Sequence, residues 1–169
     1  MSVKQRLYPS ETEAASMLEH VRHARFVWNI GLQQRGMWNE TRRYYAQKIT
    51  MATQMRELAE LRKELEWLRA GASVVQRGAL RDLDRAFQNF FNGTHAYPHA
   101  KKKRDDYRKG GFVVRDLSVK RLNKKWGAVL IPKVGYVKFR LSYLWSVVKN
   151  ATSARITLRN GQWHVSFTT

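Results

Sequence analysis

The spacing of hydrophobic residues changes once along this 169-residue chain, and that change limits the folds open to it. From residue 10 to about residue 92, apolar residues recur every three or four positions, which is the period of a buried helical face. From Phe112 onward they alternate with polar residues, the period of a strand with one buried face. A short alternating run, Val3 to Tyr8, precedes the helical part and ends at Pro9. The predicted order is therefore a strand, a set of helices, and then several strands.

The first helix has a clear start. Ser10 and Glu13 can form a capping box, in which each side chain accepts a hydrogen bond from the backbone amide of the other. The helical spacing that follows predicts a helix running to about Tyr45. We expect it to be bent or broken near Gly31 or Gly36.

Two further helices are predicted before the strands begin. Thr50 or Thr53 can cap the second helix, which Gly71 closes. The third spans about residues 73–92, and Gly93 is well suited to the position just after a helix end. The three helices are expected to form one bundle.

The last two strands form the clearest local pattern. Apolar and polar residues alternate over Ala154–Arg159 and again over Trp163–Thr168. Asn160 and Gly161 separate the two runs, and Asn-Gly favours the type I′ turn of a tight hairpin. Alternation at Trp126–Leu130 and Tyr136–Arg140 predicts two more strands.

These elements predict an α+β fold: a small antiparallel β-barrel with an inserted α-helical bundle. The first strand is expected to join the later strands, which makes the helices an insertion. The predicted domains are residues 1–9 with 111–169 for the barrel and residues 10–110 for the helices.

The chain is strongly basic, and most of the surplus follows residue 100. It has 32 Lys and Arg against 13 Asp and Glu, a formal charge of +19. From Lys101 to Thr169 there are 17 Lys and Arg but only three acids, which gives 14 of those 19 charges. Such a surface repels itself unless a polyanion neutralises it, and nucleic-acid phosphates do so with release of counterions.

Other classes of function are disfavoured. The chain has no Cys, which excludes disulfides and thiolate zinc sites and suits a reducing cytoplasm. No apolar run approaches the ~20 residues of a membrane span, and no signal segment or basic amphipathic helix points to a membrane surface. Five His residues show no third ligand for a metal, and the strand region has one acid, Asp116. We therefore expect this chain by itself to be non-catalytic.

A cationic run follows the third helix. Lys101, Lys102, Lys103 and Arg104 are consecutive and cannot all be paired locally, so they suit a phosphate backbone. Aromatic residues are interleaved with the cations that follow, and exposed rings stack on unpaired bases. An isolated run of this kind would be a solvated loop, but here further cations extend it.

Five strings, in this order, resemble the N-terminal portion of the OrfB/TnpB family of transposon proteins, which are relatives of the type V CRISPR effectors. The strings are spread along most of the chain, from Arg6 to Lys138. They are Arg6–Pro9, Ala24–Asn29, Ala79–Phe91, Tyr97–Lys103 and Ile131–Lys138.

The resemblance implies a wedge-type β-barrel interrupted by a helical recognition domain. It also implies an RNA-guided DNA endonuclease, in which guide RNA pairs with double-stranded target DNA and protein reads a short adjacent motif. Full-length members continue into a RuvC-like nuclease domain with three metal-binding acids. No such acids match here, so Mg²⁺ is expected only in a nuclease domain or subunit supplied in cis or in trans, and this chain itself needs no cofactor.

The resemblance also suggests residue roles. Side chains on the second and third helices are expected to read the DNA motif, and cations and aromatics elsewhere are expected to contact RNA or DNA backbone. The motif-reading candidates are Met51, Thr53, Met55, Val74 and Arg77. The backbone-contact candidates are Lys4, Arg6, Lys101, Lys102, Lys103, Arg104, Tyr107, Lys124, Lys125, Trp126, Lys133, Lys138 and Arg140. Trp28 and Phe87 are expected to be core residues.

Two alternatives stay open. The chain could be a stand-alone regulator that binds a DNA sequence through a helix-turn-helix-like N-terminal region. It could also be a structural basic protein of a ribonucleoprotein, although the low-complexity tails typical of that class are missing.

Overall fold

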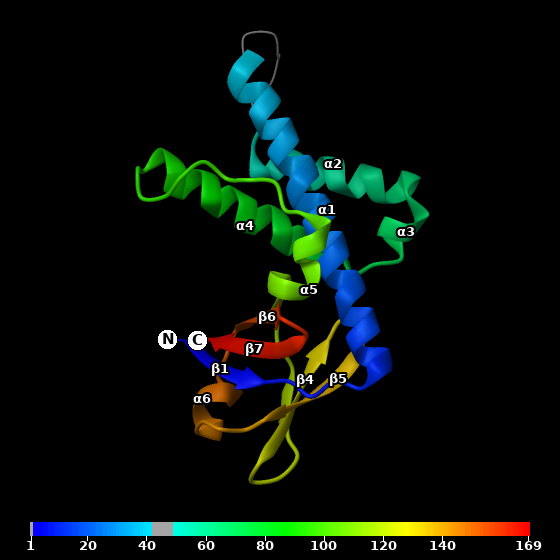
Figure 1. Ribbon diagram of the computed structural model, residues 1–169, viewed down its shortest axis with the longest axis vertical. Coiled ribbons are helices and arrows are strands. Elements are labelled where there is room, and N and C mark those ends of the chain that lie inside the picture. The colour runs from blue at the N-terminus through cyan, green and yellow to red at the C-terminus, as the bar shows by residue number, and fades with distance from the viewer. Residues whose placement is uncertain (1, 42–48) are drawn as a thin grey trace. The chain divides into compact units, whose positions relative to one another are not determined.

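The computed structural model describes residues 2–41 and 49–169, with the side chains of residues 38–41 left out of that description. The fold is α+β with antiparallel sheets (Figure 1). The chain divides into two compact units, Met1–Arg22 with Lys103–Thr169 and His23–Lys102, called here the β unit and the helical unit. The predicted domains, residues 1–9 with 111–169 and residues 10–110, stay a prediction.

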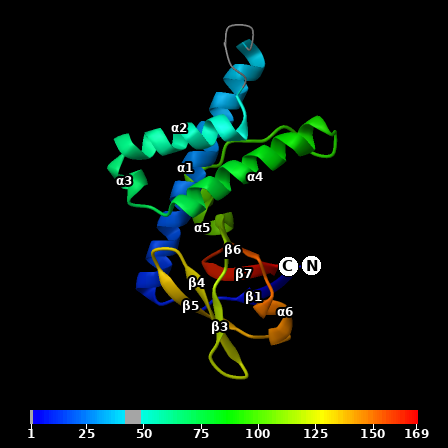
Figure 2. The same cartoon turned by 180° about the vertical axis from the view of Figure 1, so that it is seen from behind.

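The β unit contains two antiparallel sheets. One has the strand order β1-β7-β6-β2 and the other the order β3-β4-β5 (Figure 2). The first strand joins the later strands, as predicted, and its partner is the last strand, from which it is separated by most of the chain. The strands are β1 (Ser2–Arg6), β2 (Gly111–Arg115), β3 (Val119–Arg121), β4 (Trp126–Ile131), β5 (Gly135–Arg140), β6 (Ser153–Arg159) and β7 (Gln162–Thr168).

The predicted hairpin is confirmed. β6 and β7 are paired along their whole length, from Ser153 opposite Thr168 to Arg159 opposite Gln162. Between them Asn160 and Gly161 have φ values of 50° and 83°. Two consecutive left-handed residues are what a type I′ turn requires, and Asn and Gly tolerate that backbone best.

The predicted barrel is not confirmed, because neither sheet closes on itself. Residues just after β1 do connect the two sheets. Leu7 donates its amide to Trp163 of β7 (3.0 Å), and Tyr8 donates to Lys138 of β5 (2.8 Å). The residues that follow β1 pair with β5 through an isolated bridge, Leu7 opposite Phe139. A closed barrel would need a continuous ladder of hydrogen bonds there.

The core of the β unit lies between the inner faces of the two sheets. Phe139 of β5 and Phe167 of β7 are buried, with ring centroids 5.1 Å apart. Gly127 of β4 lies opposite Phe139, and a Cβ atom there would come within 2.5 Å of the Phe139 ring. The missing side chain at Gly127 therefore makes room for the ring that joins the sheets.

Helix α1 (Glu11–Thr41) contributes residues 11–22 to the β unit. Its capping box is confirmed: the Ser10 amide donates to Glu13 Oε1 (2.8 Å), and the Glu13 amide donates to Ser10 Oγ (3.2 Å). On its buried side, His20 Nε2 lies 2.7 Å from the Pro132 carbonyl oxygen, and its ring meets Phe112 edge to face. The carbonyl can only accept, so Nε2 carries the proton.

Acid should destabilise the fold through His20. Burial lowers the pKa of His20 from its usual 6.5, and the Lys133 charge lowers it further, against the raising effects of the Pro132 hydrogen bond and of Glu19. Protonation would fall on Nδ1, which is buried without a partner. The unfolded chain takes up this proton first, so the stabilisation is complete above about pH 6.5 and is lost as the pH falls towards the folded pKa.

Urea unfolding at pH 7.5 and pH 5.5 checks this prediction. We expect the wild type to lose more free energy of unfolding than His20→Gln does, at most about 1.4 kcal/mol for each unit between the two pKa values. An equal loss in both proteins would show that His20 protonation is not coupled to unfolding.

Over its described residues, the helical unit is built from the rest of α1 and three further helices. α1 is continuous from residue 11 to residue 41, so a break at Gly31 or Gly36 is wrong, and its predicted end near Tyr45 lies outside the described residues. At Gly31 a Cβ atom would come within 2.7 Å of Leu83, so this glycine allows close helix packing. The other helices are α2 (Met51–Glu64), α3 (Glu66–Arg69) and α4 (Ser73–Phe91).

One prediction for the second helix is met and one needs correction. Thr50 caps α2, and Thr53 completes a capping box with it. The second helix does not continue to Gly71, because Leu65 is extended and separates α2 from α3. Arg62 stabilises the reversal that follows, donating to the carbonyls of Leu68, Arg69 and Gly71 and to the side chain of buried Gln76.

Candidate nucleic-acid interface

The outer face of the β3-β4-β5 sheet gathers cations and aromatic rings. Residues opposite one another in an antiparallel pair share a face. In β4 and β5, Trp126 lies opposite Arg140 and Leu130 lies opposite Tyr136. Ala128 lies between Lys138 on one side and Lys120 of β3 on the other. Valine, isoleucine and Phe139 alternate with these residues on the inner, buried face.

The cations lie against the rings. The Nζ atom of Lys138 is 4.1 Å from the centroid of the Trp126 ring, and Arg140 Cζ is 5.4 Å from it. Lys120 Nζ is 4.1 Å from the centroid of Tyr136. These distances are in the range of cation–π contacts, which hold long side chains in place and leave their charges exposed to a ligand.

The N-terminal strand extends this surface. Tyr8 meets Trp126 edge to face with centroids 5.1 Å apart, and Arg6 Cζ is 4.9 Å from the Tyr8 centroid. Tyr8 is 42% exposed and Tyr136 is 40% exposed. We call the set the aromatic–cation face, and it consists of Arg6, Tyr8, Lys120, Trp126, Tyr136, Lys138 and Arg140.

The sheet formed by β1, β7, β6 and β2 presents a second cationic surface. Lys4 and Arg155 both lie opposite Ser166, one on each side of β7, and Arg6 lies opposite His164. The four strands contain five cations at exposed positions and no acid. Burial lowers the pKa of His164, and the charges of Lys4 and Arg6 lower it further.

Sequence reasoning found part of these surfaces and missed part. Lys4, Arg6, Trp126, Lys138 and Arg140 were predicted, and the structure brings the last four together. The omitted residues could have been found from one signal, their alternation with buried positions. They are Tyr8, Arg115, Tyr136, Arg155 and Arg159.

The remaining predicted cations of the β unit lie on loops and short helices. Lys124 and Lys125 are exposed in the turn between β3 and β4, where Asn123 Oδ1 accepts from the Lys125 and Trp126 amides at 2.8 and 3.0 Å. Lys133 is exposed in the β4–β5 turn with a φ of 61°. Lys103 and Arg104 begin a short 3₁₀ turn, and Tyr107 is exposed on α5 (Asp106–Lys109).

The other half of the cationic run belongs to the helical unit. Lys101 is held by Asn29 of α1, whose Nδ2 donates to the Lys101 carbonyl (2.9 Å) and whose Oδ1 accepts from the Lys101 amide (2.8 Å). Trp28 Nε1 donates to the His99 carbonyl (2.9 Å), and Lys101 Nζ lies 4.4 Å from the centroid of the Trp28 ring. The prediction that Trp28 is a core residue is therefore wrong, because Trp28 is half-buried and holds this segment in place. The same prediction for Phe87 is confirmed, since Phe87 is buried. Lys102 is exposed.

The motif-reading candidates also lie in the helical unit. Met51 and Met55 are half-buried on α2, Val74 is half-buried on α4, and Arg77 is exposed. The Thr53 hydroxyl is engaged by the α2 cap, where it accepts from the Thr50 amide and donates to the Thr50 carbonyl, both at 2.9 Å. These five roles stay predictions.

Within residues 2–41 and 49–169, no three His, Asp or Glu side chains are grouped as metal ligands would be. No helix over those residues is long and apolar enough to cross a membrane.

Comparison with known proteins places these surfaces in context. A family model of the OrfB_IS605 type, described as a helix-turn-helix domain, matches residues 1–48. A protein of Escherichia coli (strain K12) named "Putative RNA-guided DNA endonuclease InsQ" is 28% identical over 98% of this chain and 39% of its own length. A Streptomyces pristinaespiralis protein named "Putative RNA-guided DNA endonuclease" is 30% identical over 67% of this chain and 29% of its own length. The chain thus spans less than two fifths of either curated relative, and the matches support a nucleic-acid-binding role.

Proposed function

Because this chain corresponds to the N-terminal portion of an OrfB/TnpB-type protein, we propose that it is the nucleic-acid-binding module of an RNA-guided DNA endonuclease. In this role it binds the guide RNA and the DNA motif adjacent to the target. Cleavage then depends on a nuclease domain supplied in cis or in trans.

One observation carries the proposal: the aromatic–cation face places three rings among four cations, on the outer face of the β3-β4-β5 sheet and on residues 6–8 beside it. RNA-binding surfaces need both kinds of side chain, since cations neutralise phosphates and rings stack on unpaired bases. The cations already lie against the rings, at 4.1 Å for Lys138 on Trp126 and for Lys120 on Tyr136. A bound strand can therefore meet ordered charges at little cost in side-chain entropy.

The two sheets of the β unit would act together as the wedge-like barrel of the family, built from residues 1–9 and 111–169. The helices of residues 10–110 would form the recognition domain. There Met51 and Met55 offer apolar contacts for a thymine methyl group, and Arg77 offers a hydrogen-bond fork for a guanine.

The alternative, a stand-alone DNA-binding regulator, draws support from the description of the matching family model. A helix-turn-helix needs two helices joined by a tight turn. In the described part of that match, residues 2–41, the chain forms one strand and one unbroken helix. The geometry therefore favours the first proposal.

Binding of three nucleic acids of equal length tests the proposal. We expect an RNA hairpin with an unpaired flank to bind about tenfold more tightly than blunt duplex RNA or duplex DNA, because each stacked base is worth about 1–3 kcal/mol. Filter binding at several salt concentrations gives the affinities and their salt dependence. Duplex DNA that binds as tightly as the hairpin, without RNA present, would favour the regulator instead.

A further inference from the structure

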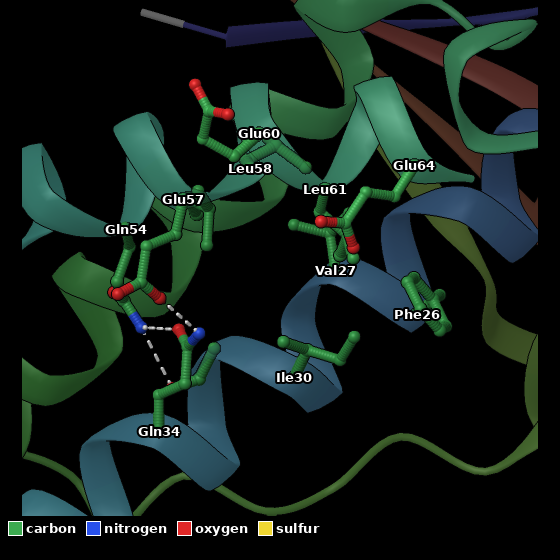
Figure 3. Close-up of a pocket in the computed structure, with 12 residues that line it drawn as sticks. Phe26, Val27, Ile30, Gln34, Gln54, Glu57, Leu58, Glu60, Leu61 and Glu64 are labelled. Atoms are coloured by element: carbon green, nitrogen blue, oxygen red, sulfur yellow. Dashed lines mark hydrogen bonds between the residues drawn. The ribbon is translucent and has the colours of Figure 1, made fainter. Parts of the chain in front are cut away.

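An apolar groove lies between α1 and α2 of the helical unit (Figure 3), and Leu80 of α4 also lines it. Its volume is about 310 Å³, at the lower end of the range for sites that hold ligands. Phe26, Val27, Ile30, Leu58 and Leu61 supply the rest of its apolar lining. Such a volume can take a few large apolar side chains.

The rim of this groove is acidic. Glu57, Glu60 and Glu64 line it from α2, and their spacing of three and four residues places them in one stripe along the helix. None of the described residues that line the groove is Lys or Arg. Glu60 also pairs with exposed Lys63 of the same helix (3.1 Å), but among the lining residues that the structure describes the only charges are acidic.

The groove is held open by hydrogen bonds at one end. Gln34 Nε2 donates to Glu57 Oε2 (2.6 Å), and Gln54 Nε2 donates to the Gly31 carbonyl (3.0 Å) and to Gln34 Oε1 (3.1 Å). Arg35 Nε donates to Gln54 Oε1 at 3.1 Å, and its guanidinium pairs with Asp84 at 2.8 Å. This network links α1, α2 and α4, so the groove exists before any partner arrives.

We propose that this groove binds a basic amphipathic helix of a partner protein. Two packed helices leave a linear depression between them, which a third helix fills with apolar residues spaced three or four apart. Lys or Arg residues flanking that apolar stripe would pair with Glu57, Glu60 and Glu64. The inference goes beyond nucleic-acid binding, since the groove offers carboxylates and apolar side chains to a ligand and none of its described lining residues is a cation.

A labelled peptide of about 14 residues tests the proposal, with Leu at every third or fourth position and Lys or Arg between. Fluorescence anisotropy measures its binding to the full chain. We expect saturable binding although both molecules are cationic, and about fivefold weaker binding to Glu60→Gln/Glu64→Gln. Glu11→Gln/Glu66→Gln removes the same charge outside the groove and should bind like the wild type.

Each other outcome overturns the proposal. No saturable binding, or equal loss in both double variants, would remove the groove as the docking site. A peptide with Glu in place of Lys and Arg that binds as well would show that charge complementarity plays no part. Sedimentation that detects self-association, abolished by Glu60→Gln/Glu64→Gln, would place a second copy of this chain in the groove instead.

Discussion

Replacing Lys120, Lys138 and Arg140 together by Gln is expected to weaken RNA binding by about 100-fold near 0.1 M salt. Each cation of the aromatic–cation face that meets a phosphate releases a counterion, and the substitution removes three such contacts. For the same reason the slope of log affinity against log salt should become shallower by about two, at roughly 0.7 per phosphate on a single strand. Filter binding across a salt series measures both quantities.

Gln is chosen because it keeps most of each side chain's length. Lys120 and Lys138 flank Ala128, which is buried although it lies on the outer face, so their aliphatic stems help to cover it. Removal of the stems would confuse lost charge with lost packing. Circular dichroism should show that the triple variant remains folded.

A matched variant separates this surface from the general charge of the protein. Arg56, Lys63 and Arg85 are exposed in the helical unit, and their replacement by Gln also removes three charges. We expect a much smaller effect on RNA affinity from that variant. If both triple variants weaken binding equally, the RNA responds to net charge and the aromatic–cation face is not its site.

Local features of the fold were predictable from sequence because they depend on neighbours in the chain. The Ser10–Glu13 box and the Asn160-Gly161 turn are both settled by residues within three positions of one another. The break at Leu65 was not predictable in this way, since no Gly or Pro marks it. There the reversal is stabilised by Arg62, whose acceptors lie six to fourteen residues away.

The same limit applies to the candidate site. Alternation along β5 placed Lys138 and Arg140 on the exposed side, and the structure agrees. It could not bring Tyr8 to Trp126, because that contact depends on the crossing of the chain from one sheet to the other at residues 7–8. Helical spacing likewise predicted that Trp28 is a core residue, because an indole at such a position gives no sign that its N–H will donate to a carbonyl 71 residues away.

Replacing Phe139 by Ala is expected to lower the free energy of unfolding by about 3–5 kcal/mol, a large part of the total for a domain of this size. Phe139 is fully buried, lies over Gly127 within its own sheet and contacts Phe167 of the other sheet. Its loss opens a cavity where the two sheets meet. Urea unfolding followed by tryptophan fluorescence measures the change.

A double-mutant cycle with Gly127 tests whether the ring and the glycine are matched. Alone, Gly127→Ala should cost about 1–3 kcal/mol, because its Cβ would come within 2.5 Å of the Phe139 ring. In the Phe139→Ala background that methyl group enters the vacated space, so its cost should nearly disappear and the two effects should fall short of additivity by about 1 kcal/mol or more. Phe87→Ala, in the helical unit, should be additive with Gly127→Ala. An unchanged cost of Gly127→Ala in both backgrounds would mean that the Phe139 ring is not what requires glycine at this position.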